Sequence, residues 1–238
     1  MRLSLCFSPC PNDTFIFDAM VNGKIDTEGL SFDVRMEDVE TLNRLALAGK
    51  PDVCKISYGL LPRVLTEYRV LESGGALGRG VGPLLVSKDP ALLDDAELAD
   101  RTVVLPGMHT TAHLLFTLAY PAARKKLFLP FHEIEDAVCN GMADAGVIIH
   151  ENRFTYERKG LTRLCDLGTV WEENTGHPIP LGGIVMRRDT DMALMRRTDR
   201  VIRRSLEYAQ SMYPELPAFV RTHRRWRRKS CAGISGCM

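Results

Sequence analysis

The chain has 238 residues, of which 45% are hydrophobic, and its formal net charge is +1. This length is enough to bury a substantial core and to divide into two lobes. A net charge near zero gives no electrostatic reason to expect a nucleic acid or a membrane surface as partner, so the composition favours a small-molecule ligand.

The N-terminal apolar stretch is interrupted by Ser4 and stopped by Pro9, which makes it too short for a signal peptide. The seven cysteines are an odd number, lie between Cys6 and Cys237, and include no Cys-x-x-Cys spacing. These features argue against a disulfide framework and against a zinc site. We therefore expect a cytoplasmic protein without a bound metal and without a membrane-spanning segment.

The first 73 residues alternate short β-type runs with helical patterns, the order typical of α/β proteins. Asp38 precedes apolar residues at helical spacing and is the expected N-cap of that helix. The expected elements, in chain order, are strand 2–7, helix 13–20, strand 31–36, the helix after Asp38, strand 52–57, a helix starting near Tyr58 and strand 68–71.

Two polar, glycine-rich stretches, residues 74–83 and 174–183, then bracket a second α/β block. Its expected elements, with the strand that follows it, are strand 84–87, strand 102–105, helix 109–119, helix 134–140, strand 145–149 and strand 184–187. We expect a lobe of residues 88–181 inserted into a lobe of residues 1–87 plus 182–238. This layout is typical of two-lobed, periplasmic-binding-protein-like (type 2) folds, in which a ligand binds in the cleft between the lobes.

The loop at residues 8–14 joins the first strand to the first helix and contains two prolines that restrict its backbone. Asn12, Asp13 and Thr14 are residue types that cap helix N-termini. Such a loop presents backbone N–H groups and short polar side chains to an oxygen-rich ligand, although an ordinary capped turn has the same pattern.

Lys55 interrupts an apolar run at the end of a predicted strand, just before Ile56 and Ser57. Open α/β sheets bind ligands at the carboxyl ends of their strands. A buried lysine is costly unless it is paired, so Lys55 either has a partner or points to solvent from an edge strand. A second strand-to-helix junction contains Thr110 and Thr111, whose hydroxyls either bind a ligand or cap the helix.

His150 follows directly after a predicted buried strand and is flanked by further polar residues. An imidazole has an ordinary pKa of about 6.5, so it can accept a proton near neutral pH. A single histidine is more often structural, but among the six histidines this one has both a strand-end position and polar neighbours. We therefore expect His150 to be the candidate base.

Several motifs together resemble the 1,4-dihydroxy-6-naphthoate synthase family of the futalosine route to menaquinone. They occur in the same order as in that family, and the resemblance extends from about residue 2 to residue 220. The motifs are Ser-Pro-Cys-Pro-Asn-Asp-Thr-Phe at Ser8, Lys-Ile-Ser-Tyr-Gly at Lys55, Pro-Gly-Met-His-Thr-Thr-Ala at Pro106, Ile-Ile-His-Glu-Asn-Arg-Phe-Thr-Tyr at Ile148, Asp-Leu-Gly at Asp166 and Pro-Leu-Gly-Gly at Pro180.

The resemblance implies a carbon–carbon lyase that converts cyclic dehypoxanthine futalosine to 1,4-dihydroxy-6-naphthoate and a dihydroxyacetone fragment, without a metal or an organic cofactor. It implies that His150 is the general base and that the segments Lys55, Ile56, Ser57 and Thr110, Thr111 contact the substrate. We add Asn12, Asp13 and Thr14 of the first loop to the expected binding residues. In this hypothesis Ser57 and the two threonines bind a carboxylate or oxyanion, and Lys55 acts electrostatically.

Two alternative functions have the same architecture. Chorismate dehydratase, of the same pathway, would remove water from a different substrate, but the segments at Ser8 and His150 favour the naphthoate synthase. A non-catalytic small-molecule binding protein is the second alternative, and the missing export signal argues against it. The sequence leaves the oligomeric state open.

After His223 the sequence becomes rich in arginine, beginning with Arg224 and Arg225, and departs from the family pattern. A basic tail can bind nucleic acid or an acidic surface. We favour a shifted reading frame, because plausible codons for residues 230–238 give a closing helix like that of the family in the neighbouring frame. Such a chain would lack a terminal helix and would be unstable or inactive.

Overall fold

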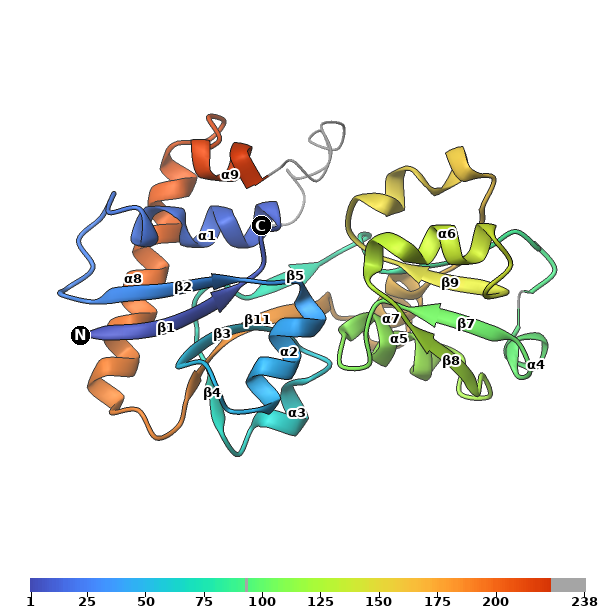
Figure 1. Ribbon diagram of the computed structural model, residues 1–238, viewed down its shortest axis with the longest axis horizontal. Coiled ribbons are helices and arrows are strands. Elements are labelled where there is room, and N and C mark those ends of the chain that lie inside the picture. Colours follow the sequence, from blue (N-terminus) through green and yellow to red (C-terminus); the bar gives the residue numbers. More distant parts are fainter. Residues whose placement is uncertain (93, 224–238) are drawn as a thin grey trace. The chain divides into compact units, whose positions relative to one another are not determined.

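The computed structural model describes residues 1–92 and 94–223 (Figure 1). The chain forms two compact units, each with its own mixed sheet and covering helices, which confirms the predicted α/β class. Of the described residues, unit 1 contains 1–76 and 182–223, and unit 2 contains 77–92 and 94–181. The arginine-rich segment from Arg224 lies outside the described residues. Within the described ranges, no helix is both long and apolar enough to cross a bilayer.

The chain enters unit 2 after residue 76, whereas the expected boundary lay after residue 87. Strand β6, Leu84–Ser87, is the reason for this difference. It pairs with β9, Ala145–Ile148, and β10, Thr162–Asp166, and therefore belongs to the unit 2 sheet. The chain returns to unit 1 between Leu181 and Gly182.

The unit 1 sheet has the strand order β2-β1-β3-β11-β4, with β5 pairing β11. The first three strands are parallel, and β11 runs antiparallel to both β3 and β4. The strands are β1 Arg2–Phe7, β2 Ser31–Met36, β3 Val53–Ser57, β4 Tyr68–Val70, β5 Ala76–Gly78 and β11 Ile179–Arg187.

Helices cover both faces of the unit 1 sheet, and the alternation of side chains along β1 explains how. Leu5 and Phe7 pack with helix α1, Pro11–Val21, and helix α8, Met192–Ser211, on one face. Cys6 points to the other face and packs with helix α2, Val39–Leu47. Figure 1 shows α1 beside α8, with α9 near α1; the remaining unit 1 helices are α3 Leu61–Val64 and α9 Ala218–His223.

The unit 2 sheet has the strand order β10-β6-β9-β7-β8, and its β7 is parallel to both β8 and β9. Helix α5, Thr111–Ala119, packs on one face and helix α6, Ile134–Cys139, on the other. The remaining elements are α4 Asp95–Leu98, β7 Thr102–Leu105, β8 Lys125–Phe128, the 3-10 helices η1 Phe131–Glu133, η2 His150–Phe154 and η3 Tyr156–Lys159, and α7 Leu167–Thr175.

The strand expected at residues 184–187 begins earlier than predicted, because β11 starts at Ile179, within the polar, glycine-rich stretch 174–183. Gly182 and Gly183 pair with Ser57 and Ile56 of β3. A Cβ atom on Gly182 would lie 2.8 Å from the carbonyl oxygen of Ile56. Glycine therefore occurs here because the two backbones approach closely.

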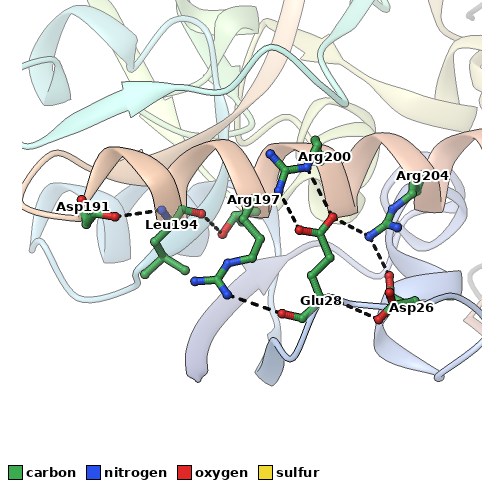
Figure 2. Close-up of polar contacts among 8 residues, drawn as sticks. Asp26, Glu28, Asp191, Leu194, Arg197, Arg200 and Arg204 are labelled. Atoms are coloured by element: carbon green, nitrogen blue, oxygen red, sulfur yellow. Dashed lines mark hydrogen bonds and ion pairs between the residues drawn. The ribbon is translucent and has the colours of Figure 1, made fainter.

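A network of charged side chains, here called the Glu28 network, connects α8 to the turn before β2 (Figure 2). Arg200 and Arg204 donate to the two carboxylate oxygens of Glu28 at 2.6 and 2.8 Å. Arg197 donates to the Glu28 carbonyl and Arg204 to the Asp26 carbonyl. Glu28 has a φ of 51°, a value that few non-glycine residues adopt. The arginines therefore hold this turn in an unfavourable backbone conformation.

Candidate active site

Lys55 lies in β3, an interior strand between β1 and β11, and its side chain is buried. Its Nζ is 3.2 Å from Oδ1 of Asp13 and donates to the carbonyl oxygen of Gly74 at 3.2 Å. Lys55 is therefore paired in the interior and does not point to solvent from an edge strand. An ion pair removed from water persists only when further polar contacts support it, as the Gly74 carbonyl does here.

Asp13 connects Lys55 to the loop at residues 8–14. Its Oδ2 accepts from the backbone N–H of Ser8 at 3.0 Å and from the Ser8 hydroxyl at 2.7 Å. The predicted capping role differs, because α1 begins at Pro11 with Cys10 as N-cap, which places Asn12, Asp13 and Thr14 inside the first turn. Proline at the first helical position explains this earlier start.

The three first-turn residues have different surroundings. Asn12 is exposed, while Asp13 and Thr14 are buried. The Thr14 hydroxyl donates to the carbonyl of Cys10 at 3.0 Å. Burial raises the pKa of the Cys10 thiol to about 12, and the nearby Asp13 charge adds to this effect. Cys10 is therefore a neutral thiol near neutral pH and not an activated nucleophile.

Ser57, at the end of β3, forms two hydrogen bonds with Asn43 of α2. Asn43 Nδ2 donates to the Ser57 hydroxyl at 3.1 Å, and the Ser57 backbone N–H donates to Asn43 Oδ1 at 2.9 Å. Asn43 is fully buried and was not among the residues expected at the site. The sequence feature that could have identified Asn43 is a polar residue at a sheet-facing position of an amphipathic helix. Ile56, in contrast, lies in the core with Leu42 and Val185, so its side chain serves packing.

Thr110 and Thr111 begin helix α5 and use their hydroxyls differently. Thr110 is the N-cap: its Oγ1 accepts from the backbone N–H of His113 and donates to the carbonyl of Gly107 at 2.9 Å. Thr111 donates to the carbonyl of Leu181 at 2.9 Å, near the point where the chain returns to unit 1. Capping therefore accounts for Thr110, and Thr111 connects α5 to Leu181 within unit 2.

His150 is exposed and begins η2, two residues after β9 ends. Its backbone φ is 56°, in the left-handed region that histidine adopts more readily than most residues. Its ring makes an edge contact with Phe131, with 5.1 Å between the ring centroids. A strained backbone that persists at a strand end is a feature of functional sites, since the surrounding structure must hold it in place.

The expected site residues therefore form two groups. In unit 1, the structure brings Asp13, Lys55 and the first loop together, and pairs Ser57 with Asn43. In unit 2, Thr110, Thr111 and His150 lie at strand-to-helix junctions. The described residues include no cluster of three or more His, Cys, Asp or Glu side chains that could hold a metal ion.

Comparisons with curated proteins identify relatives of this chain. A sequence model described as Menaquinone biosynthesis matches residues 3–232. The 1,4-dihydroxy-6-naphthoate synthase of Thermus thermophilus is 46% identical over 93% of this chain and 79% of its own length. The enzyme of the same name from Streptomyces coelicolor is 43% identical over 87% of this chain and 73% of its own length.

Solved structures show the fold. Protein AF1704 from Archaeoglobus fulgidus is 33% identical, with a TM-score of 0.86 over 95% of this chain and 83% of that chain. The alkanesulfonate-binding protein SsuA of Xanthomonas axonopodis pv. citri, 12% identical, has a TM-score of 0.61 over 95% of this chain and 84% of that one. The second likeness shows the periplasmic-binding-protein-like fold alone. Together with the sequence matches, which confirm the resemblance seen in the motifs, these findings show that the chain belongs to the menaquinone biosynthesis family.

Proposed function

We propose that this protein is a carbon–carbon lyase that forms 1,4-dihydroxy-6-naphthoate and a dihydroxyacetone fragment from cyclic dehypoxanthine futalosine. The observation that carries the proposal is the 46% identity, over 93% of the chain, to an enzyme named for that product. Its ligand is accordingly a small organic molecule. We also propose that it acts in a reducing cytoplasm, which the free thiols of Cys6, Cys10, Cys54, Cys139 and Cys165 support.

His150 is the general base in this proposal. Removal of a substrate proton lets a carbon–carbon bond break as the new ring becomes aromatic, so much of the driving force belongs to the product. An imidazole with an ordinary pKa of about 6.5 is suited to this proton transfer near neutral pH. The left-handed backbone of His150 at the end of a buried strand supports the assignment.

The remaining site residues either bind the substrate oxygens or hold the groups that do. Ser57, oriented by Asn43, donates its hydroxyl to a developing oxyanion. The N-terminus of α5 at Thr110 and Thr111 binds a carboxylate through backbone N–H groups, because the first N–H groups of a helix lack partners within the helix. The hydroxyls of these two threonines already donate to the carbonyls of Gly107 and Leu181. Lys55 and Asp13 hold the loop at residues 8–14, including Asn12 and Thr14, in one conformation against the substrate, and Ile56 contributes only backbone.

The activity is tested by incubating the protein separately with cyclic dehypoxanthine futalosine and with chorismate, followed by mass spectrometry of the products. We expect 1,4-dihydroxy-6-naphthoate from the first and no change in the second. Dehydration of chorismate would make the protein the sister enzyme instead. Binding of the first compound without turnover would make it a binding protein.

The base is tested with His150→Asn, because asparagine also tolerates the left-handed backbone and the substitution therefore leaves the fold in place. We expect kcat to fall by about 10²–10⁴-fold, the usual contribution of a general base, with little change in substrate affinity. His177→Asn is the matched control, since His177 is an exposed histidine of the same unit that follows the end of α7. Near-normal turnover by His150→Asn would contradict the assignment.

A further inference from the structure

Arg153 lies in η2, three residues after His150, and its guanidinium group connects three parts of unit 2. One side-chain nitrogen donates to the carbonyl of Gly82. The other donates to the carbonyl of Gly80 at 2.9 Å and to Oδ2 of Asp166 at 2.7 Å. The Arg153 and Asp166 side chains are only 15% and 12% exposed. Bonds of this charge-assisted kind, with little solvent competition, are among the stronger polar contacts in proteins.

Asp166 shares its two carboxylate oxygens between two tasks. Oδ2 accepts from Arg153, while Oδ1 accepts from the backbone N–H groups of Gly168 and Thr169 as the N-cap of α7. The orientation of α7 and the position of the guanidinium group are therefore fixed by the same side chain.

Residues 80–83 are held against α7 as well as by Arg153. A Cβ atom on Gly82 would lie 2.3 Å from the Cα atom of Gly168, so the two backbones are in direct contact. Gly80 donates its N–H to Glu172 of α7 at 2.8 Å. Arg153 is thus anchored to a rigid part of unit 2, built from the packed backbones of this segment and α7.

His150 needs such an anchor for two reasons. It begins a 3-10 helix of five residues, and helices of this kind have weaker hydrogen-bond geometry than α-helices. The N-cap residue is Ile149, whose apolar side chain cannot accept a hydrogen bond from the first turn. The φ of 56° at His150 is therefore held by the edge contact of its ring with Phe131 and by the contacts that fix the rest of η2.

We propose that Arg153 is a positioning residue for His150: by binding the carbonyls of Gly80 and Gly82 and the carboxylate of Asp166, it fixes η2 and with it the imidazole at its first residue. This inference rests on the proposed role of His150 as base. Arg153 itself acts through the backbone of η2 and not on the reacting atoms. A displacement of about 1 Å at a reacting group can cost about 100-fold in rate.

The test compares Arg153→Met with Arg158→Met, in which an exposed arginine of η3 is changed in the same way. Methionine keeps much of the apolar stem and removes all five donors. With cyclic dehypoxanthine futalosine as substrate, we expect kcat of Arg153→Met to fall by about 10–100-fold while KM changes by less than about threefold. Arg158→Met should retain both values. Circular dichroism and thermal melting establish that each variant is folded at the assay temperature.

Arg153→Lys is a second variant, which tests the inference if Arg153→Met does not fold. Lysine retains the charge beside Asp166, but it lacks the planar fork that binds several acceptors at fixed angles. We expect a folded protein with kcat between those of the wild type and Arg153→Met, or clearly below the wild type where Arg153→Met does not fold. A folded Arg153→Met, or failing that a folded Arg153→Lys, with wild-type kcat would overturn the inference, as would a change in KM alone.

The two proposals fail in different ways. Turnover that persists in His150→Asn removes the base assignment, whatever Arg153 does. Turnover that is lost in His150→Asn but unchanged in a folded Arg153→Met removes only the positioning role. Loss in both variants, with KM retained, supports the two together.

Discussion

Two of the ion-pair arrangements in unit 1 differ mainly in their access to water. Lys55 and Asp13 have side chains that are 9% and 4% exposed, and their partners are backbone and hydroxyl groups of the interior. In the Glu28 network, Arg200 is 57% exposed and Glu28 is 26% exposed. Water can replace a lost partner at the surface but not inside the sheet. Similar charges at similar distances should therefore contribute very differently to stability.

The largest effect expected from this difference is that of Lys55→Met. The substitution preserves most of the side-chain volume but leaves Asp13 buried without its cation, and breaking a buried pair on one side costs about 3–5 kcal/mol. Urea unfolding, followed by circular dichroism, measures this loss. The double variant Asp13→Asn, Lys55→Met removes both charges and should recover at least half of it.

Lys50→Met provides the matched control, since Lys50 is an exposed lysine of the same unit. Its unfolding midpoint should be that of the wild type. If Lys55→Met were as stable as this control, the interior ion pair would contribute no more to the free energy of unfolding than a surface charge does.

A smaller effect is expected for Glu28→Gln, which keeps the side-chain shape and removes the charge. Hydrogen bonding to Arg200 holds the pKa of Glu28 below its ordinary value of about 4.3. A lowered pKa in the folded state contributes stability that is complete above the unfolded pKa and is lost as the pH falls through the folded pKa. The difference in unfolding free energy between wild type and variant should be constant from pH 7 to about 5 and shrink below that.

Salt provides a second measurement on the same variant. Because the Glu28 network is partly exposed, added salt should screen it and reduce the difference between wild type and variant at pH 7. A difference that is independent of both pH and salt would contradict the electrostatic role of Glu28.

The smallest effect is expected at the pair between Arg2 and Asp33, whose side chains are 72% and 69% exposed. Ion pairs with this exposure contribute little, because solvent screens the charges and two long side chains lose freedom. Arg2→Gln should leave the melting temperature unchanged within error. A clear loss of stability would indicate that exposure alone does not rank the ion pairs of this unit.

Several elements could be predicted from the sequence because their signals are local. The strands Arg2–Phe7, Ser31–Met36 and Thr102–Leu105 lie where the runs of β-type residues place them. Asp38 caps α2 as predicted, with its side chain accepting from the N–H groups of Glu40 and Thr41. Strands β8 and β10 were not predicted. Charged residues such as Lys125 and Arg163 mask their pattern, and only pairing with neighbouring strands stabilises them.

The sequence alone determined the family, the α/β class and the residue types available for chemistry, since ordered motifs, period-two runs and helix caps are properties of short segments. The tertiary structure decided which of these residues are paired. It paired Asp13 with Lys55 and Arg153 with Asp166, and it brought Asn43 into hydrogen-bonding distance of Ser57. It also placed Gly182 in a strand. Such partners are separated by 13 to 42 residues in the chain. They meet only when the sheets form, because burial and backbone approach depend on the whole packed unit.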